Sequence, residues 1–205
     1  MQGYYFITNS LLSVHGIFYD VECALRAGVC AVQYRSKETP LSIQYIQALK
    51  LRSMCKGKTI FIVNDRLDLA LAVKADGVHL GQEDLPCLVA RRIAPKKMII
   101  GISVHSVEEA KKAQSDGADY ISVGPIFATK TKSDAKRPCG IDLIKKVKQA
   151  VDIPVVAIGG INLSNAKQVV KAGADALCAI SAVITKKDVL AEILKFQKLF
   201  NFKKR

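Results

Sequence analysis

Residues 155–180, VVAIGGINLSNAKQVVKAGADALCAI, contain one complete strand–helix–strand unit. The apolar run Val155–Ile158 predicts a strand, and Asn165–Ala172 has the spacing of an amphipathic helix. Gly173 follows the helical pattern directly, and glycine at this point supplies the left-handed cap that turns the chain back toward a sheet. The next apolar run, Ala176–Ile180, predicts a second strand. The stretch therefore indicates a βα repeat of a parallel sheet.

This unit recurs along the whole chain of 205 residues. Further strands are predicted at Tyr4–Thr8, Ala31–Tyr34, Thr59–Val63, Gly77–Leu80, Ile99–Ser103 and Tyr120–Val123, and helices at Leu41–Cys55, Val107–Asp116 and Ile141–Val151. Continuous apolar runs are typical of parallel strands that are covered on both faces. Repeated units of about 20–25 residues favour a closed barrel. We therefore expect a single α/β domain, a (β/α)8 TIM barrel over residues 1–205, with an open doubly wound sheet as the alternative.

The charge balance indicates the kind of partner. The chain carries 31 Lys and Arg against 18 Asp and Glu, a formal net charge of +13, which suits anionic partners. The basic residues recur along the predicted helices, without the interleaved aromatic residues on which nucleic-acid bases stack. We therefore expect small phosphorylated molecules as ligands and no binding to nucleic acid.

Composition also predicts the compartment. No stretch approaches the roughly 18 apolar residues of a membrane span, and Met1–Tyr5 lacks the pattern of a signal peptide. The six cysteines form no Cys-x-x-Cys pair, so we expect free, buried or half-buried thiols. These features predict a cytoplasmic protein without a membrane partner and leave the oligomeric state open.

Polar side chains follow almost every predicted strand. In a barrel the carboxyl ends of all strands meet on one rim, where the active site lies. The segments on this rim are Gln33–Lys37, Asn64–Arg66, Gly81–Asp84, Ser103–Ser106, Gly124–Lys132, Gly159–Ile161 and Ser181–Ala182. The sequence thus predicts one site that contains cations, amides, acids, hydroxyls and glycines.

Two acids on this rim predict a metal site. Asp65 and Asp84 end neighbouring strands, and Mg²⁺ is usually held by one or two carboxylates together with substrate phosphates and water. The alternative is that Asp65 caps the helix beginning at Leu67 and Asp84 caps the one after Pro86. We favour the metal because both acids share the rim with lysine and arginine.

Two further segments predict phosphate binding. Gly159-Gly160 and Ile180-Ser181-Ala182 each open a helix after the last two strands, where such barrels commonly bind phosphate through backbone N–H groups. The alternative is that the glycine pair forms only a tight turn. Thr129–Lys132 begins the longest polar loop and is predicted to close as a lid, whereas Ser133–Arg137 fits a solvated charge run better. A Mg²⁺ site beside phosphate sites suggests chemistry on a diphosphate.

The histidines carry less weight. His79 lies inside an apolar strand, so we expect a core residue whose ring nitrogens are bonded. No Ser/His/Asp or Cys/His arrangement indicates a nucleophile.

At these residues the chain resembles the thiamine phosphate synthase family. The matching segments are Gln33–Lys37, Asn64–Ala70, Ala75–Asp84, Gly101–Ser106, Gly124–Lys132, Ala157–Ile161 and Ile180–Ala182. They span nearly the whole chain in the right order, and Gly81-Gln-Glu-Asp84 with Thr129-x-Thr-Lys132 is the most specific combination. Departures are small: Asn9 and Ser36 stand where the family commonly has acids.

The resemblance implies a Mg²⁺-dependent transferase that joins a pyrimidine diphosphate to a thiazole phosphate, giving thiamine phosphate and pyrophosphate. The implied metal ligands are Asp65 and Asp84. The implied catalytic residues are Arg35, Lys37 and Lys132, and the implied substrate-binding residues are Gln33, Tyr34, Arg35, Ser36, Lys37, Asn64, Ser103, Thr129, Lys130, Thr131, Lys132, Gly160, Ile180 and Ser181.

Two other functions remain as alternatives. One is a thiazole tautomerase of the same superfamily, which typically lacks these acid and Thr-x-Thr-Lys segments and often has histidine where Pro125 stands here. The other is a phosphate-binding barrel without turnover. Asp65, Asp84 and Lys132 argue against both, since a pure binder needs no stabilised leaving group.

Overall fold

The computed structural model describes residues 1–37, 39–129, 131 and 136–200. Its strands are β1 Gly3–Ile7, β2 Ala31–Tyr34, β3 Ile60–Asn64, β4 Gly77–Leu80, β5 Ile99–Val104, β6 Tyr120–Val123, β7 Val155–Ile158 and β8 Ala176–Cys178. Its helices are α1 Ile17–Arg26, α2 Leu41–Cys55, α3 Leu67–Ala72, α4 Cys87–Ile93, α5 Val107–Ser115, α6 Ile141–Ala150, α7 Ala166–Lys171, α8 Ser181–Ile184 and α9 Val189–Lys198.

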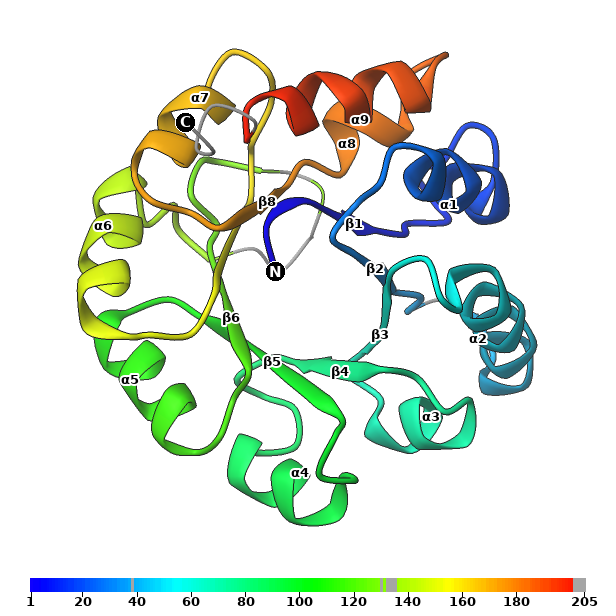
Figure 1. Ribbon diagram of the computed structural model, residues 1–205, viewed down its shortest axis with the longest axis horizontal. Helices are drawn as coiled ribbons and strands as arrows, with labels where there is room; N and C mark the ends of the chain where they lie inside the picture. Colours follow the sequence, from blue (N-terminus) through cyan, green and yellow to red (C-terminus); the bar gives the residue numbers. More distant parts are fainter. Residues whose placement is uncertain (38, 130, 132–135, 201–205) are drawn as a thin grey trace.

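The strands form a closed parallel barrel in chain order, surrounded by the helices (Figure 1). Closure comes from the pairing of β1 with β8, in which Gly3 lies opposite Ala176 and Tyr4 opposite Leu177. This pairing leaves no open sheet edge. The predicted (β/α)8 barrel is therefore confirmed, and the open doubly wound sheet is wrong.

The predicted elements agree closely with the observed ones. Helix α2 and the strands β2, β4, β6 and β7 have the predicted bounds, and most of the remaining differences are of one residue. The largest difference is at β8, which ends at Cys178 rather than Ile180. Ile180 instead precedes α8 as its N-cap, with helical backbone angles. This early end places Ile180 and Ser181 on the barrel rim.

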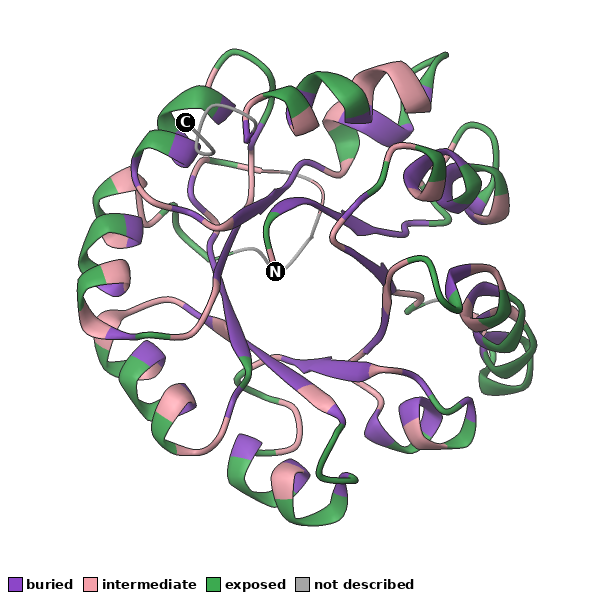
Figure 2. Cartoon of the chain, in the orientation of Figure 1, coloured by how far each residue is buried: buried purple, intermediate pink, exposed green. Residues whose placement is uncertain are grey.

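The core has two layers, because successive strand residues point to opposite sides of the barrel wall. One layer fills the barrel and includes Tyr5 and Tyr120. The larger layer lies between barrel and helices and includes Tyr4 and Phe6. In Figure 2 the strands are largely buried, with intermediate residues mainly at their ends, while the helices combine buried and exposed residues. Polar side chains that point inward near the carboxyl ends of the strands therefore line the barrel mouth.

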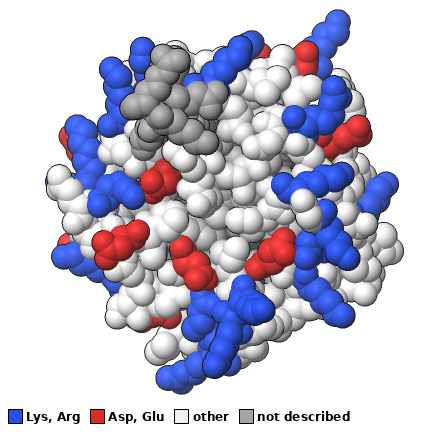
Figure 3. Space-filling model, in the orientation of Figure 1, with Lys and Arg blue, Asp and Glu red and all other residues white. Residues whose placement is uncertain are grey.

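The surface agrees with the expectations from composition. Lys and Arg side chains lie around the periphery of the face shown in Figure 3, with Asp and Glu between them, rather than over one element. All six cysteines are free and either buried or partly buried, as predicted. Within the described ranges, no helix is long and apolar enough to cross a membrane.

Candidate functional site

The two predicted metal ligands come from neighbouring loops. Asp65 follows β3 directly and has a positive φ of 62°, a conformation that aspartate tolerates better than most residues. Its backbone N–H donates to the carbonyl oxygen of His79 at 2.7 Å, which holds this turn against β4. The carboxylate of Asp84 accepts a hydrogen bond from the backbone N–H of Gly81 at 2.6 Å. Main-chain contacts thus hold the backbone of Asp65 and the carboxylate of Asp84 on the rim.

Neither acid caps a helix. The residue before α3 is Arg66 and the residue before α4 is Pro86, and no side-chain cap hydrogen bond is formed at either helix start. The capping alternative for Asp65 and Asp84 is therefore wrong. Neither side chain is therefore committed to a helix N-terminus.

The electrostatics of Asp65 bring four predicted site residues together. Burial, together with the charge and hydrogen bonding of Asp84, raises the pKa of Asp65 to about 6. The nearby charges of Lys37 and Arg35 act in the opposite direction. One carboxyl group and two cations, from the loops after β2 and β4, therefore lie near enough to Asp65 to change its pKa.

This donor set suits Mg²⁺. Two adjacent carboxylates that repel each other gain by sharing a divalent cation, and carboxylate oxygen is a preferred Mg²⁺ ligand. Within the described part of the chain, no group of three or more His, Cys, Asp or Glu side chains could hold a metal. The protein would therefore supply two carboxylates, and substrate phosphate and water would complete the octahedron.

The loop after β2 is held to the first strand. The backbone N–H of Arg35 donates to the hydroxyl oxygen of Thr8 at 3.0 Å, and this hydroxyl donates to the carbonyl oxygen of Arg35 at 3.3 Å. The Ser36 hydroxyl donates to that of Thr39 at 2.7 Å, while the Lys37 side chain is exposed. Thr8 was not predicted as a site residue, because its role depends on a loop that is distant in sequence.

Gln33 and Tyr34 point to opposite sides of β2. Gln33 faces the barrel interior, where its side-chain amide donates to the Tyr5 hydroxyl at 2.9 Å. The Tyr34 hydroxyl donates to the side chain of Gln47 in α2 at 2.7 Å, within the layer between barrel and helices. The structure therefore does not bring the Tyr34 side chain to the barrel mouth, and any ligand contact of this residue would come from its main chain.

The predicted phosphate side also comes together. The Thr131 hydroxyl donates to the Ser181 hydroxyl at 3.3 Å, and the Thr131 backbone N–H donates to the Thr129 hydroxyl at 3.2 Å. Ile180 precedes α8, and no side-chain cap bond is made there. The loop after β6 thus reaches the start of α8. Lys130 and Lys132 lie outside the described residues, as do residues 133–135 of the predicted charge run.

The glycine pair after β7 has a packing role. Gly159 and Gly160 have φ values of 99° and 63°, where a side chain is strained. A Cβ atom on Gly160 would lie 2.5 Å from the Ala128 carbonyl oxygen and 2.7 Å from the Phe127 Cβ. A side chain at Gly160 would therefore collide with the loop after β6, as well as altering the predicted phosphate site. In the structure, therefore, the missing side chain of Gly160 makes room for the backbone of the loop after β6.

A buried polar network crosses the barrel interior below the mouth. The Tyr5 and Tyr120 hydroxyls are 2.8 Å apart, and the Tyr120 hydroxyl lies 2.9 Å from His79 Nδ1. The other ring nitrogen, Nε2, lies 3.0 Å from the Ser103 hydroxyl. His79 is thus a core residue with both nitrogens bonded, as predicted. Tyr5 and Tyr120 were missed, although both stand at inward positions of otherwise apolar strands.

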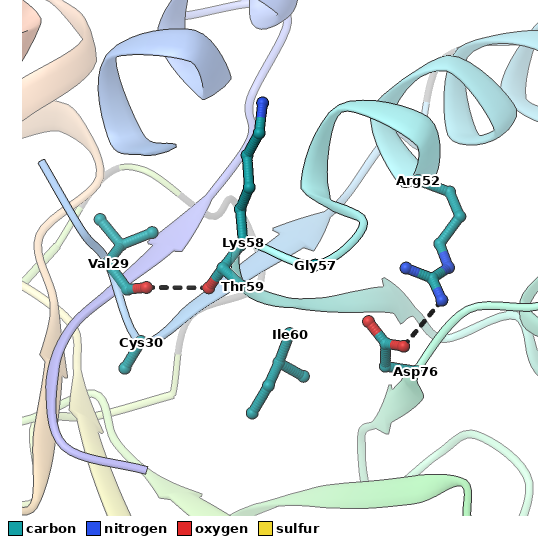
Figure 4. A pocket seen from close by; sticks show the side chains of 8 residues that line it. All are labelled: Val29, Cys30, Arg52, Gly57, Lys58, Thr59, Ile60 and Asp76. Atoms are coloured by element: carbon teal, nitrogen blue, oxygen red, sulfur yellow. Dashed lines mark hydrogen bonds and ion pairs between the residues drawn. The ribbon is translucent and has the colours of Figure 1, made fainter. Parts of the chain in front are cut away.

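A cavity lies at the opposite end of the barrel. A depression of about 400 Å³ lies at the amino ends of β2, β3 and β4 (Figure 4). Arg52 forms an ion pair with Asp76 at 2.9 Å, and the Thr59 hydroxyl donates to the Val29 carbonyl oxygen at 2.8 Å. These polar groups tie α2 and adjacent turns to the barrel, and the amino-end face generally serves stability. The carboxyl-end rim is therefore the better candidate for a site.

Comparison with known proteins gives consistent results. A sequence model of the family described as thiamine monophosphate synthase matches residues 4–183. A thiamine-phosphate synthase of Methanosarcina barkeri (strain Fusaro / DSM 804) is 47% identical over 193 residues, 94% of this chain and 88% of that protein. One of Methanospirillum hungatei JF-1 is 47% identical over 199 residues, 96% and 97% of the two chains. The structure of thiamine phosphate pyrophosphorylase from Pyrococcus furiosus matches with a TM-score of 0.89 at 40% identity, covering 98% of this chain and 96% of that one.

Proposed function

Because the chain belongs to the thiamine monophosphate synthase family, we propose that it is a thiamine-phosphate synthase whose reaction takes place on the carboxyl-end rim of the barrel. As a transferase it joins a pyrimidine diphosphate to a thiazole phosphate. The C–O bond between the pyrimidine methylene carbon and the diphosphate breaks, and its electron pair leaves with pyrophosphate. The thiazole nitrogen supplies the electron pair of the new C–N bond.

The observation that carries this proposal is the charge cluster around Asp65. Asp65 follows β3, and its electrostatic partners are Arg35 and Lys37 after β2 and Asp84 after β4. Cations beside a carboxylate pair suit a metal-bound diphosphate, since the cations complement the phosphate oxygens. A site for a simple phosphate monoester would not need this combination.

The leaving group defines the roles on this side. Asp65 and Asp84 would hold Mg²⁺ through their carboxylate oxygens. When bound, the metal would neutralise part of the charge that develops on the departing pyrophosphate. Arg35 and Lys37 would bind the remaining diphosphate oxygens, together with Lys132 from the loop after β6. No nucleophile of the protein is required, which agrees with the lack of a predicted nucleophile.

The pyrimidine ring would lie in the middle of the barrel mouth. The thiazole would lie on the side of β6 to β8, opposite the diphosphate. Gln33, Asn64 and Ser103 would contact the pyrimidine, because they stand at or one residue before the carboxyl ends of β2, β3 and β5. The second phosphate would lie between the loop after β6 and the starts of α7 and α8. Its proposed ligands are Thr129, Lys130, Thr131, Gly160, Ile180 and Ser181.

The tautomerase alternative is less well supported. That reaction moves a proton within the thiazole and needs neither a diphosphate site nor a metal. Asp65 and Asp84 lie close together beside Arg35 and Lys37, at a cost in carboxylate repulsion. A cluster of this kind is most simply explained by a ligand that carries a divalent cation and several negative charges.

The direct test is product formation. The protein is incubated with both substrates and Mg²⁺, and phosphorus NMR follows the appearance of thiamine phosphate and pyrophosphate in equal amounts. Omission of either substrate is the control. Asp68→Asn serves as a matched variant, because Asp68 is an exposed acid in α3 that is bound to Arg66 and is not among the proposed ligands. Thiazole isomerisation without coupling would favour the tautomerase, and binding without any product would favour the non-catalytic barrel.

Three further features belong to the same proposal. The whole chain would act as one catalytic domain, in the cytoplasm, on small phosphorylated molecules rather than on nucleic acid. The scattered basic residues and the free cysteines support this view.

A further inference from the structure

A chain of hydrogen bonds links two predicted pyrimidine-binding residues through the barrel interior. It runs from the Gln33 amide to the Tyr5 hydroxyl, to the Tyr120 hydroxyl, to the His79 ring and to the Ser103 hydroxyl. Its four donor–acceptor distances are 2.9, 2.8, 2.9 and 3.0 Å. Residues from β1, β2, β4, β5 and β6 take part, so the chain spans more than half of the barrel.

The direction of these bonds follows from the number of protons available. The Gln33 amide nitrogen can only donate, so the Tyr5 oxygen accepts. The Tyr5 oxygen could also accept from Tyr120, but its own buried proton would then lose Tyr120 as its acceptor, which is costly. Tyr5 therefore donates onward to Tyr120, and Tyr120 donates to His79 Nδ1. A neutral imidazole that accepts at Nδ1 carries its proton on Nε2 and donates it to Ser103. The Ser103 proton is then free for a bond outside the network.

We propose that Tyr5, Tyr120 and His79 are positioning residues that hold the Ser103 hydroxyl as a hydrogen-bond donor toward the pyrimidine ring. This inference rests on the proposed function, and it adds three residues that the motif comparison does not assign. A pyrimidine ring nitrogen is an acceptor only. When the Ser103 hydroxyl oxygen accepts a bond from His79, the rotation of the hydroxyl is fixed. Its proton then points in one direction, toward the ring nitrogen.

The surroundings keep the chain in this state. Tyr5 and Tyr120 are 1% exposed and His79 is 6% exposed, so water does not compete for their bonds. Both ring nitrogens of His79 face neutral hydroxyl groups, Nδ1 that of Tyr120 and Nε2 that of Ser103, which suits a neutral imidazole. A protonated ring would donate from both nitrogens and would break the one-way order.

Two other contacts serve the same arrangement. Gly101 lies between His79 and Tyr120 in the strand register, and a Cβ atom there would collide with the Tyr120 phenol ring. The missing side chain therefore makes room for the tyrosine beside the imidazole. The Gln82 side chain donates to the main-chain carbonyl of Ser103 at 2.6 Å, which fixes the backbone while the hydroxyl remains with His79.

The first test is a double-mutant cycle between Tyr120→Phe and Ser103→Ala. Tyr120→Phe keeps the ring and removes the bond to His79, and we expect kcat/KM for the pyrimidine diphosphate to fall about tenfold, the value of one buried hydrogen bond. The KM for the thiazole phosphate should stay within about twofold. If Tyr120 acts through Ser103, adding Tyr120→Phe to Ser103→Ala should change kcat/KM by less than about twofold. Independent, multiplying losses would overturn the proposal.

Tyr4→Phe is the matched control. Tyr4 precedes Tyr5 on β1, is equally buried, and loses one bond, from its hydroxyl to the Ala179 carbonyl oxygen at 2.9 Å. It lies in the outer layer, so we expect a similar loss of thermal stability without the tenfold loss in pyrimidine kinetics. A kinetic loss in Tyr4→Phe equal to that in Tyr120→Phe would mean that the effect is one of general stability.

The second test uses the unaltered protein and needs no turnover. Nitrogen-15 NMR of the imidazoles distinguishes the two neutral tautomers, and the chain has only three histidines to assign. We expect the proton of the neutral His79 ring to lie on Nε2, as the bond from Tyr120 to Nδ1 requires. A neutral ring with its proton on Nδ1 would reverse the bonds and overturn the inference. Absence of coupling activity with the expected tautomer would instead reject only the proposed function.

Discussion

Asp65→Asn should make the metal-free protein more stable at neutral pH. Burial and the charge of Asp84 raise the pKa of Asp65 from 3.8 to about 6, so the ionised carboxylate destabilises the fold by at most about 3 kcal/mol. Asp65 is only partly buried, and solvent screening reduces the figure to roughly 1–2 kcal/mol. Asparagine is isosteric and also tolerates the positive φ of this position. The substitution therefore removes the repulsion without introducing a new strain.

The pH dependence of this effect has a definite sign. The pKa of Asp65 is higher in the folded state than in the unfolded state, so protonation of this group favours folding at low pH. That contribution is fully present below about pH 3.8 and is lost as the pH rises through about 6. The variant should match the parent at pH 3.5 and exceed its stability above pH 6.5.

The assay is urea unfolding in the presence of a chelator, at several pH values between 3.5 and 8. We expect a gain in Tm of roughly 2–8 °C at pH 7.5 in a parallel thermal scan. Mg²⁺ with pyrophosphate should narrow or reverse the difference, because only the carboxylate can ligate the metal. Asp68→Asn is the control, since the hydrogen bond from Arg66 lowers the pKa of this exposed acid and outweighs the effect of burial. A variant that is less stable at pH 7.5, or a gain that does not depend on pH, would refute the reasoning.

Three further outcomes are expected. Asp84→Ala should lower turnover at least about 100-fold and leave the circular dichroism spectrum unchanged; near-normal activity at low Mg²⁺ would contradict its role as a metal ligand. Ser181→Ala should raise the KM for the thiazole phosphate several-fold in steady-state assays, with little change for the pyrimidine diphosphate, and an equal loss for both would argue against a phosphate contact. Gly160→Ala should destabilise the fold by roughly 2–4 kcal/mol in urea unfolding, because its Cβ would collide with the Ala128 carbonyl oxygen; an unchanged midpoint would show that the loop moves freely.

Much of the fold was determined by local sequence patterns. Apolar strand runs, helical spacing and glycines after helices predicted the eight strands and the bounds of α2. These features depend on residues that are near one another in the chain, so their periodicity is visible without coordinates. The same applies to the rim, because alternation of strands and helices places every strand end on one face.

The tertiary structure alone decided how the site residues meet. The sequence predicted Asp65 and Asp84 as a pair, but their mutual effect on pKa depends on the turn at Asp65 and the turn that holds Asp84. It predicted both Gln33 and Tyr34 as binding residues, whereas strand alternation sends the Tyr34 side chain to the helix layer. Contacts of this kind depend on distances across the barrel, which local patterns do not encode.

The interior network shows the same limit. Gln33, His79 and Ser103 each stood out as single residues, while Tyr5 and Tyr120 read as ordinary strand residues. Only closure of the barrel brings five strands close enough for their inward side chains to exchange hydrogen bonds. The sequence alone determined the fold, the rim and the family resemblance. The barrel geometry decided which carboxylates share a charge cluster, which glycine makes room for a ring and which way a buried serine donates its proton, because each of these depends on groups that meet only after folding.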